Sequence, residues 1–192
     1  RREFVPLAVV SYRVPVSQST SLAADFAAEY GMRKYSALGW YDARTPMPDN
    51  YRYLPGYTGD RETEQAWRAG DARYTQIDCD EMIAQNRMAA GHAVYALEDR
   101  TERLGDLNFS ALFTTALDAR LTLRYGLVLR HARSRNYKQM RDLLGAEYIT
   151  DIDQYLVDDD TYSNLLENDL RRPGRTIRKG GRFGYDYALT TR

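Results

Sequence analysis

The sequence lacks most of the residues that build disulfides and metal sites. It contains one cysteine, Cys79, and two histidines, His92 and His131, which lie far apart in the chain. A single cysteine cannot form an internal disulfide, and the two histidines form no metal-binding motif. The 27 Lys and Arg residues balance 27 Asp and Glu residues. This balance gives no electrostatic reason to expect a nucleic-acid partner.

Long apolar runs are also missing. No run approaches the roughly 20 residues that a transmembrane helix needs, which excludes a bundle of membrane helices. A membrane β-barrel stays open, because its strands are only alternately apolar. The hydrophobic fraction of 43% argues against intrinsic disorder. Tyrosine is abundant, with 16 Tyr against 5 Phe, and tyrosine favours strands and surfaces where one end of the ring is wet.

Alternation of apolar and polar residues with a period of two is the main structural signal. In residues 22–33, Leu22 and Phe26 share one face while Asp25 and Glu29 lie on the other. Similar alternation recurs in residues 107–115, 119–131 and 183–190, and residues 4–14 are strand-like. A period of two is typical of strands and not of helices. The sequence therefore predicts an all-β, antiparallel fold of about five long strands.

The connections between these strands alternate in length. Residues 15–21 and 116–119 are short turns, whereas residues 34–92 and 135–180 are long connections. Short turns alternating with long loops are typical of outer-membrane barrels. Aspartate caps predict helices over residues 61–69 and 79–88 inside the first long connection. We also expect a short helix over residues 137–144, ended by a glycine, and a helical turn or two within residues 161–170.

Several segments resemble the β-barrel of a group of TonB-dependent receptors from Bacteroidetes. They are, in order, residues 35–43 (YSALGWYDA), 49–57 (DNYRYLPGY), 98–100 (EDR), 136–148 (NYKQMRDLLGAEY), 151–154 (DIDQ), 168–170 (NDL) and 182–187 (RFGYDY). The resemblance extends from about residue 20 to the end of the chain and is specific, because several independent segments match in order.

The resemblance implies an outer-membrane barrel of about 22 strands that is plugged by an N-terminal domain. Such receptors import a glycan, an iron chelate, a vitamin or a peptide, with energy from the TonB complex. By this resemblance, residues 1–192 are a fragment of the barrel domain, with no plug domain and no TonB box. The implied partners are the outer-membrane bilayer, the TonB complex through parts absent here, and a surface lipoprotein such as many of these receptors carry.

Within a barrel, the apolar strand faces should meet lipid. We expect lipid contacts from Leu22, Phe26, Phe109, Phe113, Leu121, Leu123 and Leu127, and aromatic girdle positions for Tyr30, Tyr125 and Tyr185. Aromatic side chains of the first long connection are the candidate substrate-binding residues, since their faces can stack on sugar rings or chelates: Trp40, Tyr41, Tyr51, Tyr53, Tyr57 and Trp67. The alternative is a purely structural role, in which these rings pack the loop against itself and its neighbours.

Two charged stretches offer further candidates. The acidic run from Asp151 to Asp160 could supply oxygen ligands to calcium, but its spacing does not match an EF-hand. The basic run from Arg171 to Arg182 could bind an anionic substrate or lipopolysaccharide phosphates. We find no nucleophile paired with a base, no metal triad and no phosphate loop, so we expect no catalytic residues, no metal and no cofactor.

Two other classes of protein remain open at this point. A soluble β-sandwich module that binds carbohydrate through its aromatic loops would show the same alternation, with its apolar faces buried against a second sheet. An enzyme on a β scaffold is the third class. The preferred interpretation is a receptor in the cell outer membrane that captures a nutrient and is not an enzyme.

Overall fold

The computed structural model describes residues 1–41, 43–153 and 168–192, and the described chain is mostly antiparallel β. The five longest strands are β2 (Leu7–Pro15), β3 (Thr20–Trp40), β4 (Tyr95–Ala116), β5 (Thr122–Asp142) and β8 (Arg182–Thr191). Short strands are β1 (Arg2–Phe4), β6 (Ile149–Thr150) and β7 (Thr176–Ile177). The helices are η1 (Tyr51–Tyr53), α1 (Pro55–Thr58), α2 (Arg61–Ala69), α3 (Ala72–Thr75) and α4 (Cys79–Met88).

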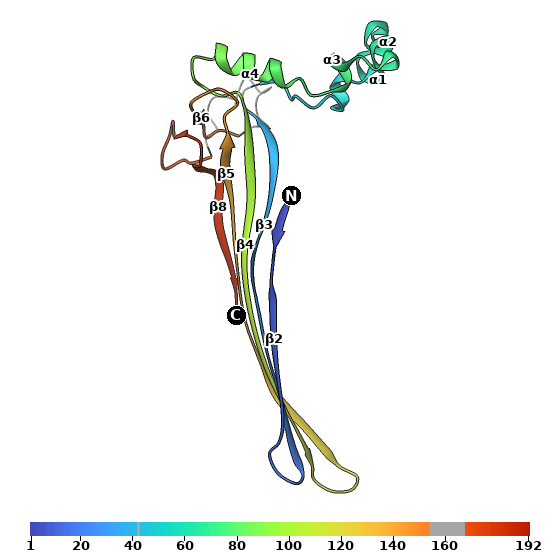
Figure 1. The fold of residues 1–192 in the computed structure, drawn as a ribbon, viewed down its shortest axis with the longest axis vertical. Coiled ribbons are helices and arrows are strands. Elements are labelled where there is room, and N and C mark those ends of the chain that lie inside the picture. The colour runs from blue at the N-terminus through green and yellow to red at the C-terminus, as the bar shows by residue number, and fades with distance from the viewer. Residues whose placement is uncertain (42, 154–167) are drawn as a thin grey trace. The chain divides into compact units, whose positions relative to one another are not determined.

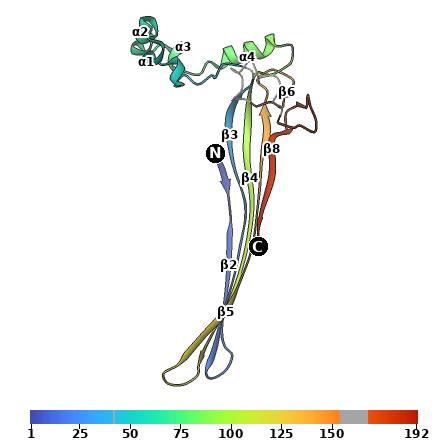
Figure 2. The ribbon, with the colours of Figure 1, turned by 180° about the vertical axis from the view of Figure 1, so that it is seen from behind.

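The long strands form one open sheet. Its order is β1-β3-β4-β5-β8, and β2 also pairs with β3 (Figures 1 and 2). Strands β1 and β2 follow the same register along β3, with Phe4 opposite Met32 and Leu7 opposite Glu29. A Cβ atom on Gly31 would lie 2.4 Å from the carbonyl oxygen of Phe4, so this edge strand approaches closely enough to require glycine.

The chain divides into two compact units. The strand unit comprises residues 1–35, 100–138 and 185–192, and the loop unit comprises residues 36–99 and 139–184. The strand unit contains β1, β2 and most of the length of β3, β4, β5 and β8. The loop unit contains every helix, the short strands β6 and β7, and the remaining ends of the long strands.

The sheet of the strand unit has two chemically different faces. The hydroxyls of Thr20 and Thr115 lie 3.0 Å apart, so even-numbered residues of β3 share a face with odd-numbered residues of β4. The stacked rings of Phe113 and Tyr125 extend this face to the odd-numbered residues of β5. We call it the apolar face, and Phe26 on it is 43% exposed. The expected alternation is therefore present on three neighbouring strands.

The other side of the sheet, the polar face, is cross-linked by side chains. Arg33 donates to Glu3 at 2.8 Å and to Glu102 at 3.4 Å. Glu102 also accepts from the hydroxyl of Ser134 at 3.2 Å, and Asn136 donates to that hydroxyl. This chain of contacts, which we call the polar ladder, links β1, β3, β4 and β5.

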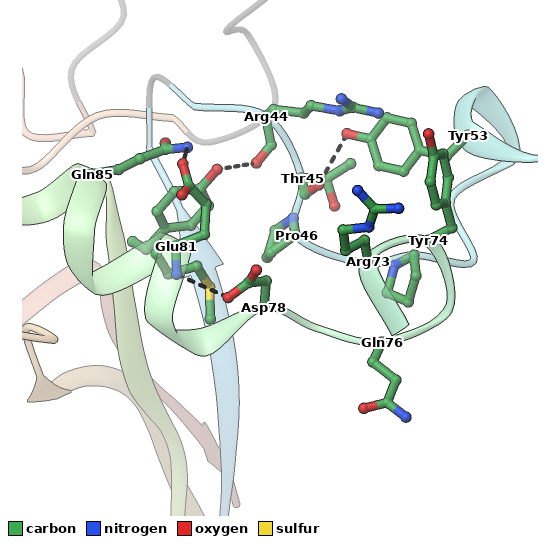
Figure 3. Close-up of a pocket in the computed structure, with 13 residues that line it drawn as sticks. Arg44, Thr45, Pro46, Tyr53, Arg73, Tyr74, Gln76, Asp78, Glu81 and Gln85 are labelled. Carbon is green, nitrogen blue, oxygen red and sulfur yellow. Dashed lines mark hydrogen bonds between the residues drawn. The ribbon is translucent and has the colours of Figure 1, made fainter. Parts of the chain in front are cut away.

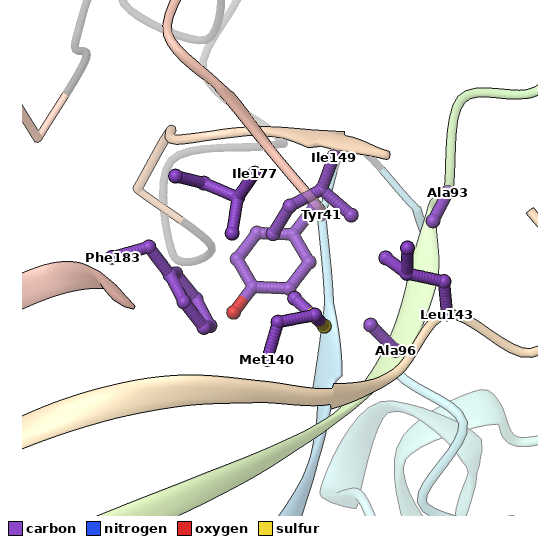
Figure 4. Close-up of a cluster of buried hydrophobic side chains, with 8 residues drawn as sticks. All are labelled: Tyr41, Ala93, Ala96, Met140, Leu143, Ile149, Ile177 and Phe183. Carbon is purple, nitrogen blue, oxygen red and sulfur yellow. The ribbon is translucent and has the colours of Figure 1, made fainter. Parts of the chain in front are cut away.

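A small core holds the loop unit together (Figure 4). It consists of Tyr41, Ala93, Ala96, Met140, Leu143, Ile149, Ile177 and Phe183. The rings of Tyr41 and Phe183 meet edge to face with their centroids 6.2 Å apart. These residues lie in or directly beside the ends of β3, β4, β5 and β8 and in β6 and β7, so the core packs the long connections against the strand ends within this unit.

The capped helices are confirmed, but the expected helix over residues 137–144 is wrong. β5 continues to Asp142, because Met140 donates its N–H to Gly181 and accepts from Gly180, both at 2.8 Å. Strand pairing thus outweighs the helix-like spacing of apolar residues in this segment. Positive φ angles at Leu144 and Gly145 then turn the chain. The turns expected within residues 161–170 fall largely outside the described residues.

Candidate binding site

The helices of the first long connection are positioned by aspartate caps. Asp60 accepts from the backbone N–H and the hydroxyl of Thr63, and these hydrogen bonds lower the pKa of Asp60. Asp78 accepts from the N–H of Glu81 and starts α4, while Gly70 ends α2 in the left-handed conformation. Contacts between α1 and α2 and between α2 and α3 gather the short helices.

A hollow of about 500 Å³, which we call the loop hollow, lies beside these helices (Figure 3). It is lined by Tyr53 of η1, by Arg73 and Tyr74 of α3, and by one side of α4 with its cap, and the lining residues are Arg44, Thr45, Pro46, Pro48, Tyr53, Arg73, Tyr74, Gln76, Asp78, Glu81, Met82, Gln85 and Tyr95. Three tyrosines, two arginines and two prolines therefore meet carboxylate and amide groups. Aromatic faces combined with charged and amide groups suit a ligand that carries both apolar faces and many hydroxyls.

Hydrogen bonds hold the tyrosines of the loop hollow in place. The Tyr95 hydroxyl donates to the carbonyl of Arg44 at 2.8 Å, and burial raises the pKa of this tyrosine. The Tyr53 hydroxyl donates to the carbonyl of Thr45 at 2.9 Å. The guanidinium of Arg44 lies 3.7 Å from the centroid of the Tyr53 ring, so a cation already covers one face of that ring.

The six aromatic residues expected in the site take different positions. Tyr53 lines the loop hollow, whereas Tyr51 and Tyr57 form a separate exposed pair with ring centroids 5.3 Å apart. Trp40 ends β3 and is half-buried. Trp67 in α2 is half-buried, and its indole nitrogen is buried without a hydrogen-bond partner among the described residues.

Tyr41 serves the core and does not face solvent. Its ring is only 2% exposed, and its hydroxyl donates to the buried carboxylate of Glu98 at 2.8 Å. Tyr41 was predicted to bind substrate because it directly follows Trp40 in the aromatic-rich first long connection. The alternation of polar and apolar residues does not show that its side chain is buried. The lining residues Tyr74 and Tyr95 were missed, since each is a single aromatic residue in a mixed segment.

The sequence also gave no signal for Asn86, which organises the loop unit. Its side-chain oxygen accepts from the N–H groups of Val94 and Tyr95 at 2.9 and 3.0 Å. Its amide nitrogen donates to the carbonyls of Tyr95 and Leu143 at 2.8 and 2.9 Å. One fully buried side chain in α4 thereby joins the start of β4 to the segment that follows β5.

A second hollow, of about 600 Å³, opens on the polar face of the strand unit. Arg33, Glu102 and Asn136 of the polar ladder line it, together with Arg100 and Tyr185. Tyr185 was expected at a lipid-facing girdle position, but it lies beside polar side chains. The ion pair between Arg135 and Asp186 places those two residues on the opposite face, which explains this position of Tyr185.

Asp151 and Arg175 join the two charged stretches at 3.5 Å. Asp151 is buried and accepts from the N–H of Gly184, the amide of Asn168 and the guanidinium of Arg175. Donors therefore occupy the oxygens that a calcium ion would need. Asp142 accepts from the backbone N–H of Leu144 and pairs with Lys179 at 3.1 Å. Both contacts lower the pKa of Asp142. Asp158–Asp160 lie outside the described residues.

Within the described part of the chain, no group of three or more His, Cys, Asp and Glu side chains is placed to hold a metal ion. No helix of that part is long and apolar enough to cross a membrane. Comparison of the chain with protein-family models, with curated proteins and with solved structures finds no match.

Proposed function

We propose that this chain is part of the barrel of a TonB-dependent receptor in the cell outer membrane, which binds and imports a glycan, an iron chelate, a vitamin or a peptide. The observation that carries the proposal is the contrast between the two faces of the sheet in the strand unit. Ion pairs and hydrogen bonds link Arg33, Glu102 and Ser134 across the polar face, whereas Phe26, Leu123 and Leu127 on the other face are between 43% and 51% exposed. A lumen and a lipid surface would require this division.

The connections support the same proposal. Residues 16–19 and 117–121 join hairpins by short turns, while residues 41–94 and 143–181 form long connections. Both short turns lie at one end of the strands, as in a barrel with periplasmic turns and extracellular loops. The loop hollow would then lie among the extracellular loops and take part in substrate capture. TonB and a surface lipoprotein would act through other parts of the full receptor.

The localisation can be tested with the complete open reading frame that contains this sequence. After expression in a Gram-negative host, the membranes are fractionated and the outer-membrane fraction is run on a gel with and without heating. We expect a band that shifts on heating, because a closed barrel resists detergent until it is heated. A soluble protein without a heat shift would contradict the receptor proposal.

The loop hollow favours one alternative, a soluble β-sandwich module that binds carbohydrate. Its lining tyrosines, including Tyr53 and Tyr74, would stack on sugar rings in that case as well. The two functions differ in what covers the apolar face, since a sandwich buries it against a second sheet. A soluble, monodisperse protein that binds oligosaccharides and loses binding on Tyr53→Ala or Tyr74→Ala would support the module.

A further inference from the structure

Three arginines lie on the apolar face where its apolar residues end. Arg2 is paired with Lys34 in the register that places Phe4 opposite Met32. Arg103 is an odd-numbered residue of β4 and therefore shares the face of Phe113. Arg133 is an odd-numbered residue of β5 and lies four residues beyond Leu129 on the same face. All three are exposed.

These arginines differ from those of the polar face. Arg13 pairs with Asp25 at 2.9 Å, and Arg33 pairs with Glu3 at 2.8 Å. Arg130, on the same strand as Arg133, pairs with Asp106. In contrast, Arg2, Arg103 and Arg133 form no ion pair with any described residue. On the apolar face itself, Arg135 pairs with Asp186 at 3.0 Å. Arg2, Arg103 and Arg133 thus differ from these four paired arginines, because none of the three has a carboxylate partner among the described residues.

A hollow of about 360 Å³ adjoins Arg103 on the apolar face. It is lined by Phe4, Ala8, Ala28, Tyr30 and Met32, with Arg103 at its border. The small side chains of the two alanines leave the space between the larger ones. A guanidinium without a carboxylate partner therefore stands directly beside an apolar hollow within the strand unit.

We infer that this edge of the apolar face binds a membrane lipid that carries phosphate in its head group. One acyl chain lies in the hollow between Tyr30 and Met32, and Arg103 and Arg133 bind the phosphate. The inference rests on the proposed function, because the apolar face must lie in a bilayer. The arginines lie at the end of the apolar residues that leads to the long connections, so the lipid belongs to the leaflet on that side.

The chemistry of the guanidinium favours phosphate over other occupants. Arginine presents a planar array of donors that matches phosphate oxygens and loses less hydration than an ammonium group. An acidic protein partner would match the charge of the arginines, but it would not account for the acyl-sized apolar hollow along the strands. A basic group directly above a continuous apolar band is the arrangement that an anionic lipid requires on a protein surface.

Native mass spectrometry of the full-length receptor can test this inference. The purified receptor in a neutral detergent is titrated with dioleoyl phosphatidylglycerol and, in parallel, with dioleoylglycerol, which has the same chains and no phosphate. We expect tighter binding of the phosphorylated lipid, weakened about 5-fold by Arg103→Gln and about 30-fold by Arg103→Gln combined with Arg133→Gln. The matched control is Arg130→Gln on the polar face, which should leave lipid binding unchanged.

The controls separate this inference from the proposed function. Each variant is first checked for the heat-dependent gel shift, so a variant that does not fold is recognised. Equal binding of the two lipids to a heat-shifting receptor, or an equal loss of binding with Arg130→Gln, would overturn the lipid site and leave the receptor proposal intact. A full-length protein that shows no heat shift would overturn both.

Discussion

Asn86 offers the sharpest test of how the loop unit is held together. Replacement of Asn86 by Leu keeps the approximate size of the side chain and removes its four close hydrogen bonds to the backbone. The N–H groups of Val94 and Tyr95 then lose their acceptor. A buried amide without a partner costs about 1–3 kcal/mol, so the buried N–H of Tyr95 alone predicts a loss of about 1–3 kcal/mol, and the half-buried N–H of Val94 adds to it.

Hydrogen exchange measures this loss where it occurs. A decrease of about 2 kcal/mol in the local opening free energy accelerates amide exchange about 30-fold. We therefore expect exchange of residues 93–96 to accelerate by at least this factor in Asn86→Leu, in the full-length protein. The control is Gln85→Ala on the same helix, which removes only an exposed hydrogen bond to Glu81.

A second substitution at this position adds a pH dependence. Asn86→Asp keeps an acceptor for Val94 and Tyr95, but places a carboxylate oxygen against the carbonyls of Tyr95 and Leu143. Burial and those carbonyls should raise the pKa of the new carboxyl group, so protonation at acidic pH restores one donor. We expect partial recovery of protection as the pH falls. Unchanged exchange in Asn86→Leu would refute the assigned role.

Three further predictions follow from contacts described above. Tyr41→Phe removes the hydroxyl that donates to Glu98 and should lower the opening free energy of the loop unit by about 1–3 kcal/mol, measured by hydrogen exchange; no change would show that other groups satisfy the carboxylate. The lowered pKa of Asp142 stabilises the fold above the unfolded-state pKa, and this contribution is lost as the pH falls through the folded-state pKa, so Asp142→Asn should be less stable at pH 7 and less sensitive to acid. Leu123→Arg should cost about 2–4 kcal/mol in a urea titration of the receptor in vesicles if Leu123 meets mid-bilayer lipid, whereas Thr122→Arg on the polar face should cost little; equal costs would contradict the assignment of faces.

The strand pattern and the capped helices were predictable because both signals are local. A period of two survives in any setting that separates two faces, and the aspartate at position 60 with the glycine at position 70 marks both ends of α2. The segment 137–144 was not predictable in this way. Its ladder partners, Gly180 and Gly181, lie about forty residues farther along the chain, so only the tertiary structure shows that the strand continues.

The candidate site was predictable only in part. The tyrosine-rich segment 51–57 drew attention to the right connection and supplied Tyr53. The positions of Tyr74 and Tyr95 depend on how α3 and α4 pack, which a linear sequence does not display. The basic run from Arg171 to Arg182 was a candidate anion site. In the structure, however, its residues Arg172, Arg175 and Lys179 form ion pairs with aspartates.

The alternation of short and long connections also implies an order of assembly. Closing a chain segment costs entropy that grows as (3/2)RT ln n, so joining β3 to β4 across residues 41–94 costs about 2 kcal/mol more than joining β4 to β5 across residues 117–121. The turn of the second hairpin is further fixed by Asp118, which accepts from the N–H groups of Arg120 and Leu121. The β2–β3 and β4–β5 hairpins should therefore form early and independently. Their side-by-side pairing would follow, as a slower step that waits for the long connection to become compact.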